Sequence, residues 1–351
     1  MSDILLELNN EQLMPVKDTE GAVLVFAGAG SGKTRVLTSR IAYLIEEKRV
    51  SPSNILAITF TNKAANEMKE RIEGLVSFAG GMWVSTIHSM CVKILRANIG
   101  RLNYTQNFTI YDETDREKAL KRVLADRGIQ DEKNQILKNL KFHLSNAKNQ
   151  FLTPAEYQRE NITLKDINSI CELMEAYENY MFSSNALDFD DILVKCYELL
   201  IKNEDVKEYY TEKFKYVHVD EFQDTNKIQF LIIKLLASKH GNLFVVGDDD
   251  QSIYGWRGAD IQNILGFEKK FGKVKVYKLE QNYRSTKKIL SLANAIISKN
   301  KMRKTKTLWT DNDEGAAEPI ADIIAVTFTA FLFAFQFKKA IQKIDQQLCG
   351  R

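Results

Sequence analysis

The sequence predicts an α/β fold in which helices cover both faces of a parallel sheet. Short β-branched or aromatic runs alternate with segments of helical period along most of the chain. One of these runs enters a glycine-rich loop and then a helix, and another ends in two consecutive carboxylates. Alternation of this kind is typical of a parallel sheet. The right-handed crossover rule makes it a doubly wound, nucleotide-binding fold whose sites lie at the carboxyl ends of the strands.

Six strands are expected from apolar runs bounded by polar or turn residues. They are Val23–Phe26, Ile55–Phe60, Met82–Thr86, Tyr216–Asp220, Leu243–Gly247 and Val274–Tyr277. Amphipathic helices are expected between them, for example over Lys63–Val76 and His88–Ile99. The apolar residues of these helical segments recur at the spacing that places them on one face.

The region from Asp112 to Leu187 interrupts this alternation with helical patterns alone. The expected helices are Thr114–Arg127, Glu132–Asn146, Pro154–Glu160 and Leu164–Phe182. We interpret the region as an all-helical insertion between two parts of one sheet domain.

The composition indicates an ordinary globular protein of two domains, or of one elaborated domain. The chain has 351 residues, of which 44% are hydrophobic and 27% charged. A net charge of +3 does not by itself indicate a nucleic-acid partner. Between Lys269 and Lys306, however, 13 Lys or Arg accompany a single acid, Glu280. This stripe fits either a surface that tracks phosphates or solvated helix faces.

The cysteines and the first residues favour a cytoplasmic protein. Four widely spaced cysteines without a CxxC pair suggest reduced thiols and not a disulfide framework: Cys91, Cys171, Cys196 and Cys349. The first seven residues lack the basic and apolar regions of a signal peptide. The uncharged run Ile323–Phe337 is interpreted as a buried strand or helix, with a weak membrane segment as the alternative. No stable membrane association is expected.

The glycine-rich loop predicts a site for nucleotide phosphates. It reads Ala27, Gly28, Ala29, Gly30, Ser31, Gly32, Lys33 and Thr34, and Arg35 follows it. Small residues let successive backbone N–H groups point at an anion, and the helix that follows adds its partial positive charge. Lys33 is expected to reach the β- and γ-phosphates and Thr34 to bind Mg²⁺, although Ala27 stands where the pattern has glycine. The alternative is a glycine-rich turn with an incidental Lys-Thr.

The strand over Tyr216–Val219 ends in the carboxylates of Asp220 and Glu221. Beside a phosphate loop, Asp220 is expected to hold Mg²⁺ and Glu221 to polarise the attacking water as a general base. Glu221 is also a candidate metal ligand. The alternative is an acidic helix cap, a role that we expect Asp224 to fill.

The run from Leu243 to Gly258 joins an acidic turn to a glutamine, two aromatic residues and an arginine. Gln251 is expected to contact the γ-phosphate, and Tyr254 and Trp256 to stack on unpaired bases beside Arg257. The alternative places both aromatic side chains in the core.

The run from Leu279 to Thr286 supplies a second arginine and tyrosine. Arg284 is expected to approach the γ-phosphate in the manner of an arginine finger. Tyr283 is expected to stack on adenine. The alternative for Arg284 is a surface residue that caps a helix.

Together these motifs resemble superfamily 1A DNA helicases of the UvrD/Rep/PcrA type, in the family's order, from about Leu8 to Asp313. The resemblance implies that Gln12 reads the adenine edge and that Phe60 and Thr61 meet a DNA base. It also implies that His88 contacts DNA and that the run from Val219 to Asp224 is a Walker B motif.

The resemblance implies an ATP-dependent 3′–5′ DNA helicase that acts in DNA repair or replication and requires ATP and Mg²⁺. Its expected partners are single-stranded DNA, single-strand/duplex junctions and repair or replication loading proteins. It divides the chain into a first RecA-like domain (1–111 and 188–281), a helical insertion (112–187), the start of a second RecA-like domain (282–315) and an off-family tail (316–351).

The part of the sequence that resembles the family includes the first motor domain but only the start of the second. After Gly315 the sequence no longer looks like the family, as a frameshift or truncation would produce. The isolated chain is therefore expected to be weakly active or inactive. Two alternatives stay open: a non-catalytic fragment that binds ATP and single-stranded DNA, and a relative of the recombination helicase-nucleases.

Overall fold

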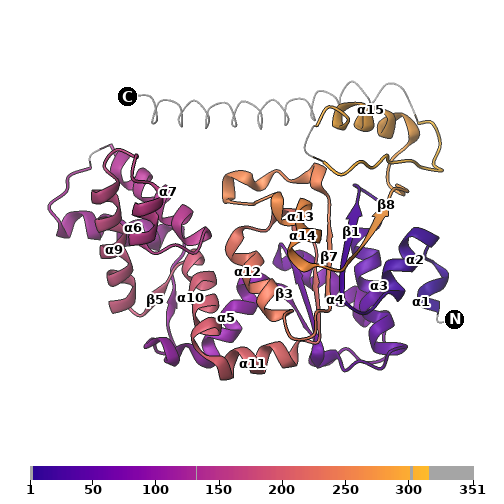
Figure 1. Cartoon of the computed structure of the whole chain (residues 1–351), viewed down its shortest axis with the longest axis horizontal. Helices are drawn as coiled ribbons and strands as arrows, with labels where there is room; N and C mark the ends of the chain where they lie inside the picture. Colours follow the sequence, from indigo (N-terminus) through magenta and orange to yellow (C-terminus); the bar gives the residue numbers. More distant parts are fainter. Residues whose placement is uncertain (1–2, 132, 301–302, 316–351) are drawn as a thin grey trace.

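A computed structural model of the chain describes residues 3–131, 133–300 and 303–315. Its centre is a six-stranded sheet, all of whose paired strands run parallel, in the order β3-β2-β6-β7-β1-β8 (Figure 1). The strands are β1 (Ala22–Ala27), β2 (Ile55–Thr59), β3 (Trp83–Thr86), β6 (Tyr216–Val219), β7 (Leu243–Gly247) and β8 (Val274–Leu279). All six expected strands are confirmed, and so is the α/β class.

Successive residues of the central strands enter two different cores because side chains alternate across a sheet. On β1, Leu24 and Phe26 belong to one buried cluster, whereas Val23 and Val25 belong to the other. The first cluster packs against α5, α10 and α12, and the second against α2, α3 and α4. The apolar runs are therefore continuous in sequence because both faces of each strand are buried.

The helices of the sheet region cover both faces and continue past its last strand (Figure 1). They are α1 (Asp3–Leu6), α2 (Asn10–Lys17), α3 (Lys33–Glu46), α4 (Asn62–Glu73), α5 (Ile87–Asn98), α10 (Phe189–Lys202), α11 (Glu204–Lys213), α12 (Lys227–Leu236), α13 (Gln262–Leu265), α14 (Phe267–Phe271) and α15 (Lys287–Ile297). The helices expected at Lys63–Val76 and His88–Ile99 are confirmed as α4 and α5.

The expected helical insertion forms four helices with a core of their own, at a distance from the sheet (Figure 1). They are α6 (Glu113–Asp126), α7 (Gln135–Asn149), α8 (Pro154–Glu160) and α9 (Ile167–Ser183). Helix α7 begins three residues later than expected. The carboxylate of Asp131 accepts the backbone N–H groups of Gln135 and Leu137 at 2.8 and 2.7 Å and fixes the preceding turn.

A two-stranded parallel sheet lies where the chain leaves the sheet domain and returns to it. Strand β4 (Thr109–Ile110) pairs with β5 (Ala186–Leu187), so the two ends of the helical region lie side by side. Neither strand is expected from the sequence, because two residues carry no periodic pattern.

Two expectations from the composition have a structural outcome. Cys91, Cys171 and Cys196 are free and buried, and Cys349 lies outside the described residues. Within the described ranges, none of the helices has the length and apolar character needed to cross a bilayer. The run Ile323–Phe337 also lies outside those ranges.

Candidate functional site

The motif-bearing loops meet at one edge of the sheet because the strands before them run parallel. Phe26 of β1 is paired with Gly247 of β7, and Val219 of β6 with Val245. The glycine-rich loop, the acidic pair and the acidic turn at 248–250 therefore leave neighbouring strands at the same end. This is the edge at which parallel α/β sheets bind ligands.

The glycine-rich loop has the backbone geometry that its sequence predicts. Gly30 and Gly32 have φ angles of 69° and 88°, in the left-handed region that favours glycine. Gln12 is buried and its Nε2 donates to the carbonyl of Ser31 at 3.0 Å. A Cβ built at Gly32 would lie 2.8 Å from this Nε2, so the loop closes tightly against Gln12. Asn9 caps α2 in a reciprocal capping box with Gln12, which fixes the side chain.

Lys33 and Glu221 meet across the ends of β1 and β6. The Lys33 Nζ lies 3.1 Å from Glu221 Oε2, and the two side chains are 12% and 33% exposed. Glu221 has a φ of 51°, an unusual conformation for a residue with a side chain. Gln223 Nε2 donates to the same Oε2 at 2.8 Å and so holds the carboxylate toward Lys33.

Three carboxylates surround this lysine, and burial perturbs two of them. Burial, followed by the charge of Glu221, raises the pKa of Asp220 to about 6 and that of Asp224 to about 7. The Oδ1 of Asp224 is buried and has no hydrogen-bond partner within the described residues. Thr34 supplies a hydroxyl in the first turn of α3. The three carboxylates carry more negative charge than Lys33 can balance. Together with the Thr34 hydroxyl they offer oxygen ligands, which Mg²⁺ prefers.

The structure corrects the expected role of Asp224. Residues Phe222–Asp224 form a 3₁₀ turn, and Asn226 is the residue that caps α12. The Asn226 side chain accepts the backbone N–H of Gln229 at 2.9 Å. The expectation was wrong because the 3₁₀ turn delays the start of the helix by two residues.

Gln251 lies in the turn after β7 and is connected to Glu221 by hydrogen bonds through two residues, Asp248 and Gln223. Its Nε2 donates to the carboxylate of Asp248. The backbone N–H of Asp248 donates to Gln223 Oε1 at 3.0 Å, and Gln223 in turn donates to Glu221. Gln251 and the acidic pair therefore belong to one hydrogen-bonded network.

The segment after β8 lies directly on the glycine-rich loop. The backbone N–H of Tyr283 donates to the carbonyl of Gly30 at 2.9 Å. Asn282 Nδ2 donates to the carbonyl of Ala29 at 2.5 Å, a contact not anticipated from the sequence. A Cβ at Gly30 would lie 2.8 Å from the Cβ of Arg284, so this arginine stands beside the loop. Arg284 is not a helix cap, because α15 begins after Thr286.

Three further predicted residues of the loop region have other contacts. Arg35 pairs with Glu7, with 2.5 Å between Nη2 and Oε2, on an exposed surface. Ala27 is the last, fully buried residue of β1. A Cβ at Gly28 would lie 2.2 Å from Leu308 Cδ2, so a larger residue there would require the Leu308 side chain to move.

Phe60, Tyr254 and Trp256 form an aromatic surface, with Phe60 directly after the carboxyl end of β2. The rings of Phe60 and Tyr254 are stacked with centroids 5.0 Å apart, and Trp256 lies 6.3 Å from Tyr254. Phe60 is 38% exposed and Trp256 59%, so these are not core aromatics. The backbone of Arg257 ends this turn, whereas its side chain lies outside the described part of the chain.

Thr61 and His88 begin the two helices that flank this surface. The Thr61 hydroxyl accepts the N–H of Ala64 at 3.1 Å and caps α4. His88 packs edge-on against Phe189, which is 53% exposed at the first position of α10, with centroids 6.1 Å apart. Burial lowers the pKa of His88, which favours the neutral form of its imidazole. Phe189 was not singled out from the sequence, although its place between aspartates at a helix start was the available signal.

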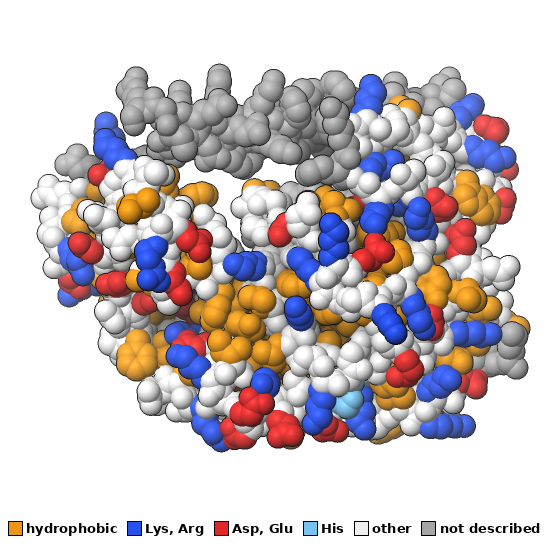
Figure 2. All heavy atoms as spheres, in the orientation of Figure 1, with side chains coloured by type: hydrophobic (Ala, Val, Ile, Leu, Met, Phe, Trp, Pro, Cys, Tyr) orange, Lys and Arg blue, Asp and Glu red, His pale blue; other side chains and the backbone are white. Residues whose placement is uncertain are grey.

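The basic stripe of residues 269–306 is not a single phosphate-tracking surface. Lys306 is buried, and its side chain and that of Arg303 pair with the aspartates after β7. Lys275 pairs with Asp18, and Lys304 with Glu268. On the face shown in Figure 2, Lys and Arg are interspersed with Asp and Glu. The sequence suggested either a phosphate-tracking surface or solvated helix faces, and neither interpretation predicts a buried lysine such as Lys306.

Comparison with known proteins decides the family. Residues 8–272 match the family model of the UvrD/REP helicase N-terminal domain. The chain belongs to the UvrD/REP helicase family. Residues 277–332 match the UvrD-like helicase C-terminal domain, which extends beyond Gly315 into residues that the structure does not describe. The sheet and the glycine-rich loop are accordingly those of a RecA-like P-loop fold.

Relatives at about half identity are named ATP-dependent DNA helicase PcrA. The protein of this name from Staphylococcus aureus (strain Mu50 / ATCC 700699) is 52% identical over 316 residues, which are 90% of this chain and 43% of the relative. That of Staphylococcus epidermidis (strain ATCC 12228 / FDA PCI 1200) is 51% identical over 318 residues, with the same coverage. The UvrD/REP-family chain described here thus spans less than half the length of these relatives.

Proposed function

We propose that residues 1–315 form the nucleotide-binding half of an ATP-dependent 3′–5′ DNA helicase that acts in DNA repair or replication in the cytoplasm. The observation that carries the proposal is the meeting of Lys33 and Glu221 at 3.1 Å. A P-loop lysine and a carboxylate at the end of another strand of the same sheet are what hydrolysis of a nucleoside triphosphate requires. The PcrA relatives, which are named ATP-dependent DNA helicases, support the same activity.

The glycine-rich loop and the acidic pair divide the tasks of phosphate binding, metal binding and catalysis. Backbone N–H groups of residues 28–34 hold the phosphates, and Lys33 leaves Glu221 to contact the β- and γ-phosphates. Thr34 and Asp220 would hold Mg²⁺, which when bound neutralises charge on the phosphate oxygens. Released from Lys33, Glu221 takes a proton from the attacking water as a general base. Gln223, which donates to Glu221 at 2.8 Å, keeps its carboxylate oriented.

The base and the γ-phosphate are recognised from the opposite side of the loop. Gln12 and Tyr283 hold the adenine by its edge and its face. Arg284 and Gln251 contact the γ-phosphate, and Arg35 supports the phosphates once it leaves Glu7. The contacts of residues 282–284 with Ala29 and Gly30 support this assignment. Removal of a γ-phosphate arginine typically costs about 10³–10⁵ in rate.

Single-stranded DNA is proposed to lie along the aromatic surface of Phe60, Tyr254 and Trp256, flanked by Thr61, His88 and Arg257. The exposure of Phe60 and Trp256 supports this proposal. Single-strand/duplex junctions and loading proteins are the proposed partners of the larger assembly.

We also propose the domain division expected from the sequence. The first RecA-like domain comprises residues 1–111 and 188–281, the insertion residues 112–187 and the start of the second domain residues 282–315. The separate core of α6–α9 supports the insertion boundaries. The sequence suggested an off-family tail from residue 316, but the C-terminal family model reaches residue 332, so such a tail is proposed only for residues 333–351.

The test compares the chain with its Lys33→Ala variant. Fluorescence titration with mant-ATP and Mg²⁺ measures binding, and phosphate release with and without oligo-dT measures hydrolysis. Lys63→Ala is the matched control, because Lys63 has an 88% exposed side chain on α4. We expect Lys33→Ala to abolish binding and Lys63→Ala to preserve it.

The outcomes separate the candidate functions. Binding that depends on Lys33 and hydrolysis that oligo-dT stimulates support the motor half. Binding without hydrolysis indicates a fragment that only binds ATP and DNA. If Lys33→Ala leaves mant-ATP affinity unchanged, the proposed nucleotide site is refuted.

A further inference from the structure

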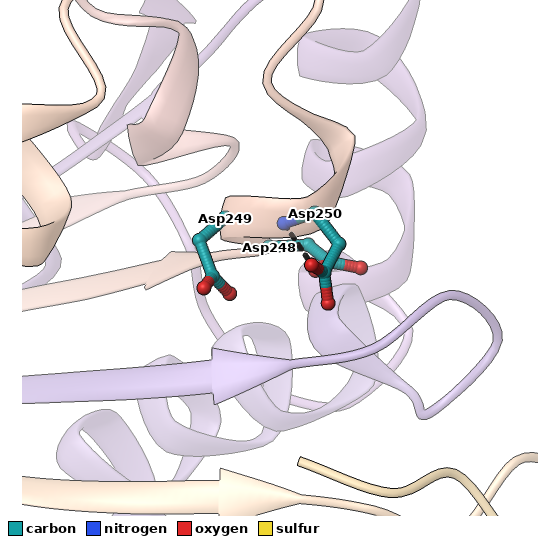
Figure 3. Close-up of side chains that lie close together, drawn as sticks. All are labelled: Asp248, Asp249 and Asp250. Carbon is teal, nitrogen blue, oxygen red and sulfur yellow. Dashed lines mark hydrogen bonds between the residues drawn. The ribbon is translucent and has the colours of Figure 1, made fainter. Parts of the chain in front are cut away.

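Lys306 is buried against three consecutive carboxylates. Its Nζ lies 2.8 Å from Asp248 Oδ1, 2.5 Å from Asp249 Oδ1 and 2.8 Å from Asp250 Oδ2. The side chains of all four residues are at most 8% exposed. Figure 3 shows the three aspartates gathered after the end of β7. The ammonium group occupies the space in which three such carboxylates would otherwise hold a metal ion.

The segment that carries Lys306 is fastened to the same turn at two more points. Arg303 Nη2 lies 2.8 Å from Asp250 Oδ2, and the backbone N–H of Lys304 donates to Asp249 Oδ2 at 2.6 Å. Two cations thus face three buried carboxylates. Removal of either cation would leave a buried charge without compensation, which is strongly unfavourable.

Asp248 connects this buried lysine to the nucleotide site. One of its carboxylate oxygens accepts from Lys306 and the other from Gln251 Nε2. Its backbone N–H donates to Gln223, which donates to Glu221. Lys306 is therefore two contacts from Gln251 and three from Glu221.

The other end of the same segment reaches the glycine-rich loop. Two residues after Lys306, the Leu308 side chain packs on Gly28, and a Cβ built there would lie 2.2 Å from Leu308 Cδ2. The next residue, Trp309, exchanges backbone hydrogen bonds with Glu280 and Asn282, in the segment between the end of β8 and Arg284. Residues 303–309 thus bridge the acidic turn and the phosphate loop.

We propose that Lys306 is a positioning residue of the nucleotide site, which holds Asp248 and through it aims Gln251 at the γ-phosphate. The inference rests on the proposed function, because it needs a triphosphate in the loop. It gives the segment after α15 a defined task, which is to set how strongly the site distinguishes ATP from ADP. Without the ammonium group of Lys306, the Asp248 carboxylate and the Gln251 amide that donates to it sample other rotamers, and the selectivity is lost.

The test measures the ratio of the mant-ADP and mant-ATP dissociation constants, with Mg²⁺, in the full 351-residue chain. Lys306→Met is compared with Lys306→Arg, which retains a cation, and with Lys304→Met. Lys304 is the matched control: its side chain pairs with Glu268 on the surface, and its backbone contact to Asp249 survives the substitution. A double variant, Lys306→Met/Asp249→Asn, removes one carboxylate with the cation.

We expect Lys306→Met and the double variant to lower the preference for ATP about tenfold, the effect of one hydrogen bond to a charged group. Lys306→Arg restores the preference and Lys304→Met leaves it unchanged. If Lys306→Met does not fold, as judged by circular dichroism, the double variant decides. A folded variant that lacks Lys306 yet keeps the full preference overturns the inference, and so does an equal loss in Lys304→Met.

Two results distinguish this inference from the proposed function. If the unchanged chain binds mant-ATP through Lys33 but does not prefer it to mant-ADP, the role of Lys306 is refuted and the nucleotide site stands. If the unchanged chain binds neither nucleotide, both are refuted.

Discussion

The Nζ of Lys33 and the Oε2 of Glu221 form an ion pair at 3.1 Å that reaches from the end of β1, across β7, to the end of β6. In the proposed mechanism, a phosphate group displaces Glu221 from this lysine before the carboxylate acts on water. The ion pair therefore keeps the carboxylate of Glu221, the proposed base, bound to Lys33 until a nucleotide arrives. This exchange of partners leads to the first prediction.

Glu221→Gln separates binding from hydrolysis. The amide leaves Lys33 free for phosphate but cannot take a proton, so we expect mant-ATP affinity to be kept or improved while hydrolysis falls about 10²–10⁴-fold. Single-turnover phosphate release measures the second quantity. Glu204→Gln, on an exposed glutamate of α11, is the control. Hydrolysis at the normal rate in Glu221→Gln would remove Glu221 from the proposed mechanism.

Asp224→Asn is predicted to stabilise the protein at pH 8 and to have little effect near pH 4. The folded state raises the pKa of Asp224 to about 7 from an ordinary value of 3.8, mainly through burial. The folded state thus binds more protons than the unfolded state, and stability is lost as the pH rises from about 4 through 7. We expect a gain of about 2 kcal/mol at pH 8 in urea unfolding.

The control for this prediction is Asp166→Asn, which changes an exposed aspartate before α9. Its free energy of unfolding should change by less than about 0.5 kcal/mol at either pH. An Asp224→Asn gain that is the same at pH 4 and pH 8 would contradict titration as its cause.

Phe60→Ala is predicted to weaken binding of oligo-dT. The ring stacks on Tyr254 and is 38% exposed, so its loss removes one stacking platform and disturbs a second. Stacking contributes about 1–3 kcal/mol per base, equivalent to an affinity loss of roughly 5- to 150-fold. Fluorescence anisotropy of labelled oligo-dT measures it.

Phe78→Ala is the matched control because Phe78 is an exposed phenylalanine, at 67%, outside the aromatic surface. Equal losses in the two variants would show that the aromatic surface is not the DNA site.

Lys148→Met is predicted to destabilise the helical insertion. Lys148 Nζ lies 3.0 Å from Asp188 Oδ2 and 2.7 Å from Asp191 Oδ1, and all three side chains are at most 8% exposed. Removal of the lysine leaves two buried carboxylates with reduced compensation, at a cost of about 3–5 kcal/mol in the free energy of unfolding. Chemical denaturation followed by circular dichroism measures it.

Lys141→Met is the control, since Lys141 lies on the same helix as Lys148, α7. Its ion pairs are made at the surface, with Glu113 and Glu117 of α6. Its effect should stay below about 1 kcal/mol. Similar costs for the two variants would show that the Lys148 network contributes no more than a surface pair.

The centre of the sheet could be predicted from the sequence because β1, β2 and β7 are buried on both faces and are continuous apolar runs. The order of motifs likewise predicted that loops from β1, β6 and β7 would meet. The short strands β4 and β5 could not be predicted, because their pairing depends on where the insertion ends. Asn226 and Asp224 are both good caps, and only the 3₁₀ turn decides between them.

The burial of Lys306 is the clearest contact that no sequence pattern reveals. Lysine in a polar stretch is usually solvated, and its partners lie more than fifty residues earlier in the chain. Three consecutive aspartates after a buried strand were the only hint that a cation had to come from elsewhere. Tertiary pairing of this kind depends on how two distant segments cross, which local propensity does not encode.

The position of β1 in the sheet has a consequence for synthesis of the protein. Val23 pairs with Phe244 on one side and with Lys275 on the other, so the first strand made acquires both neighbours only late in translation. Until then an apolar strand with two open edges must emerge from the ribosome and wait, the state in which nascent chains most readily associate with one another. Slow translation of the intervening helices should therefore lengthen the time in which β1 can associate with other chains, and a chaperone that covers β1 should prevent that association.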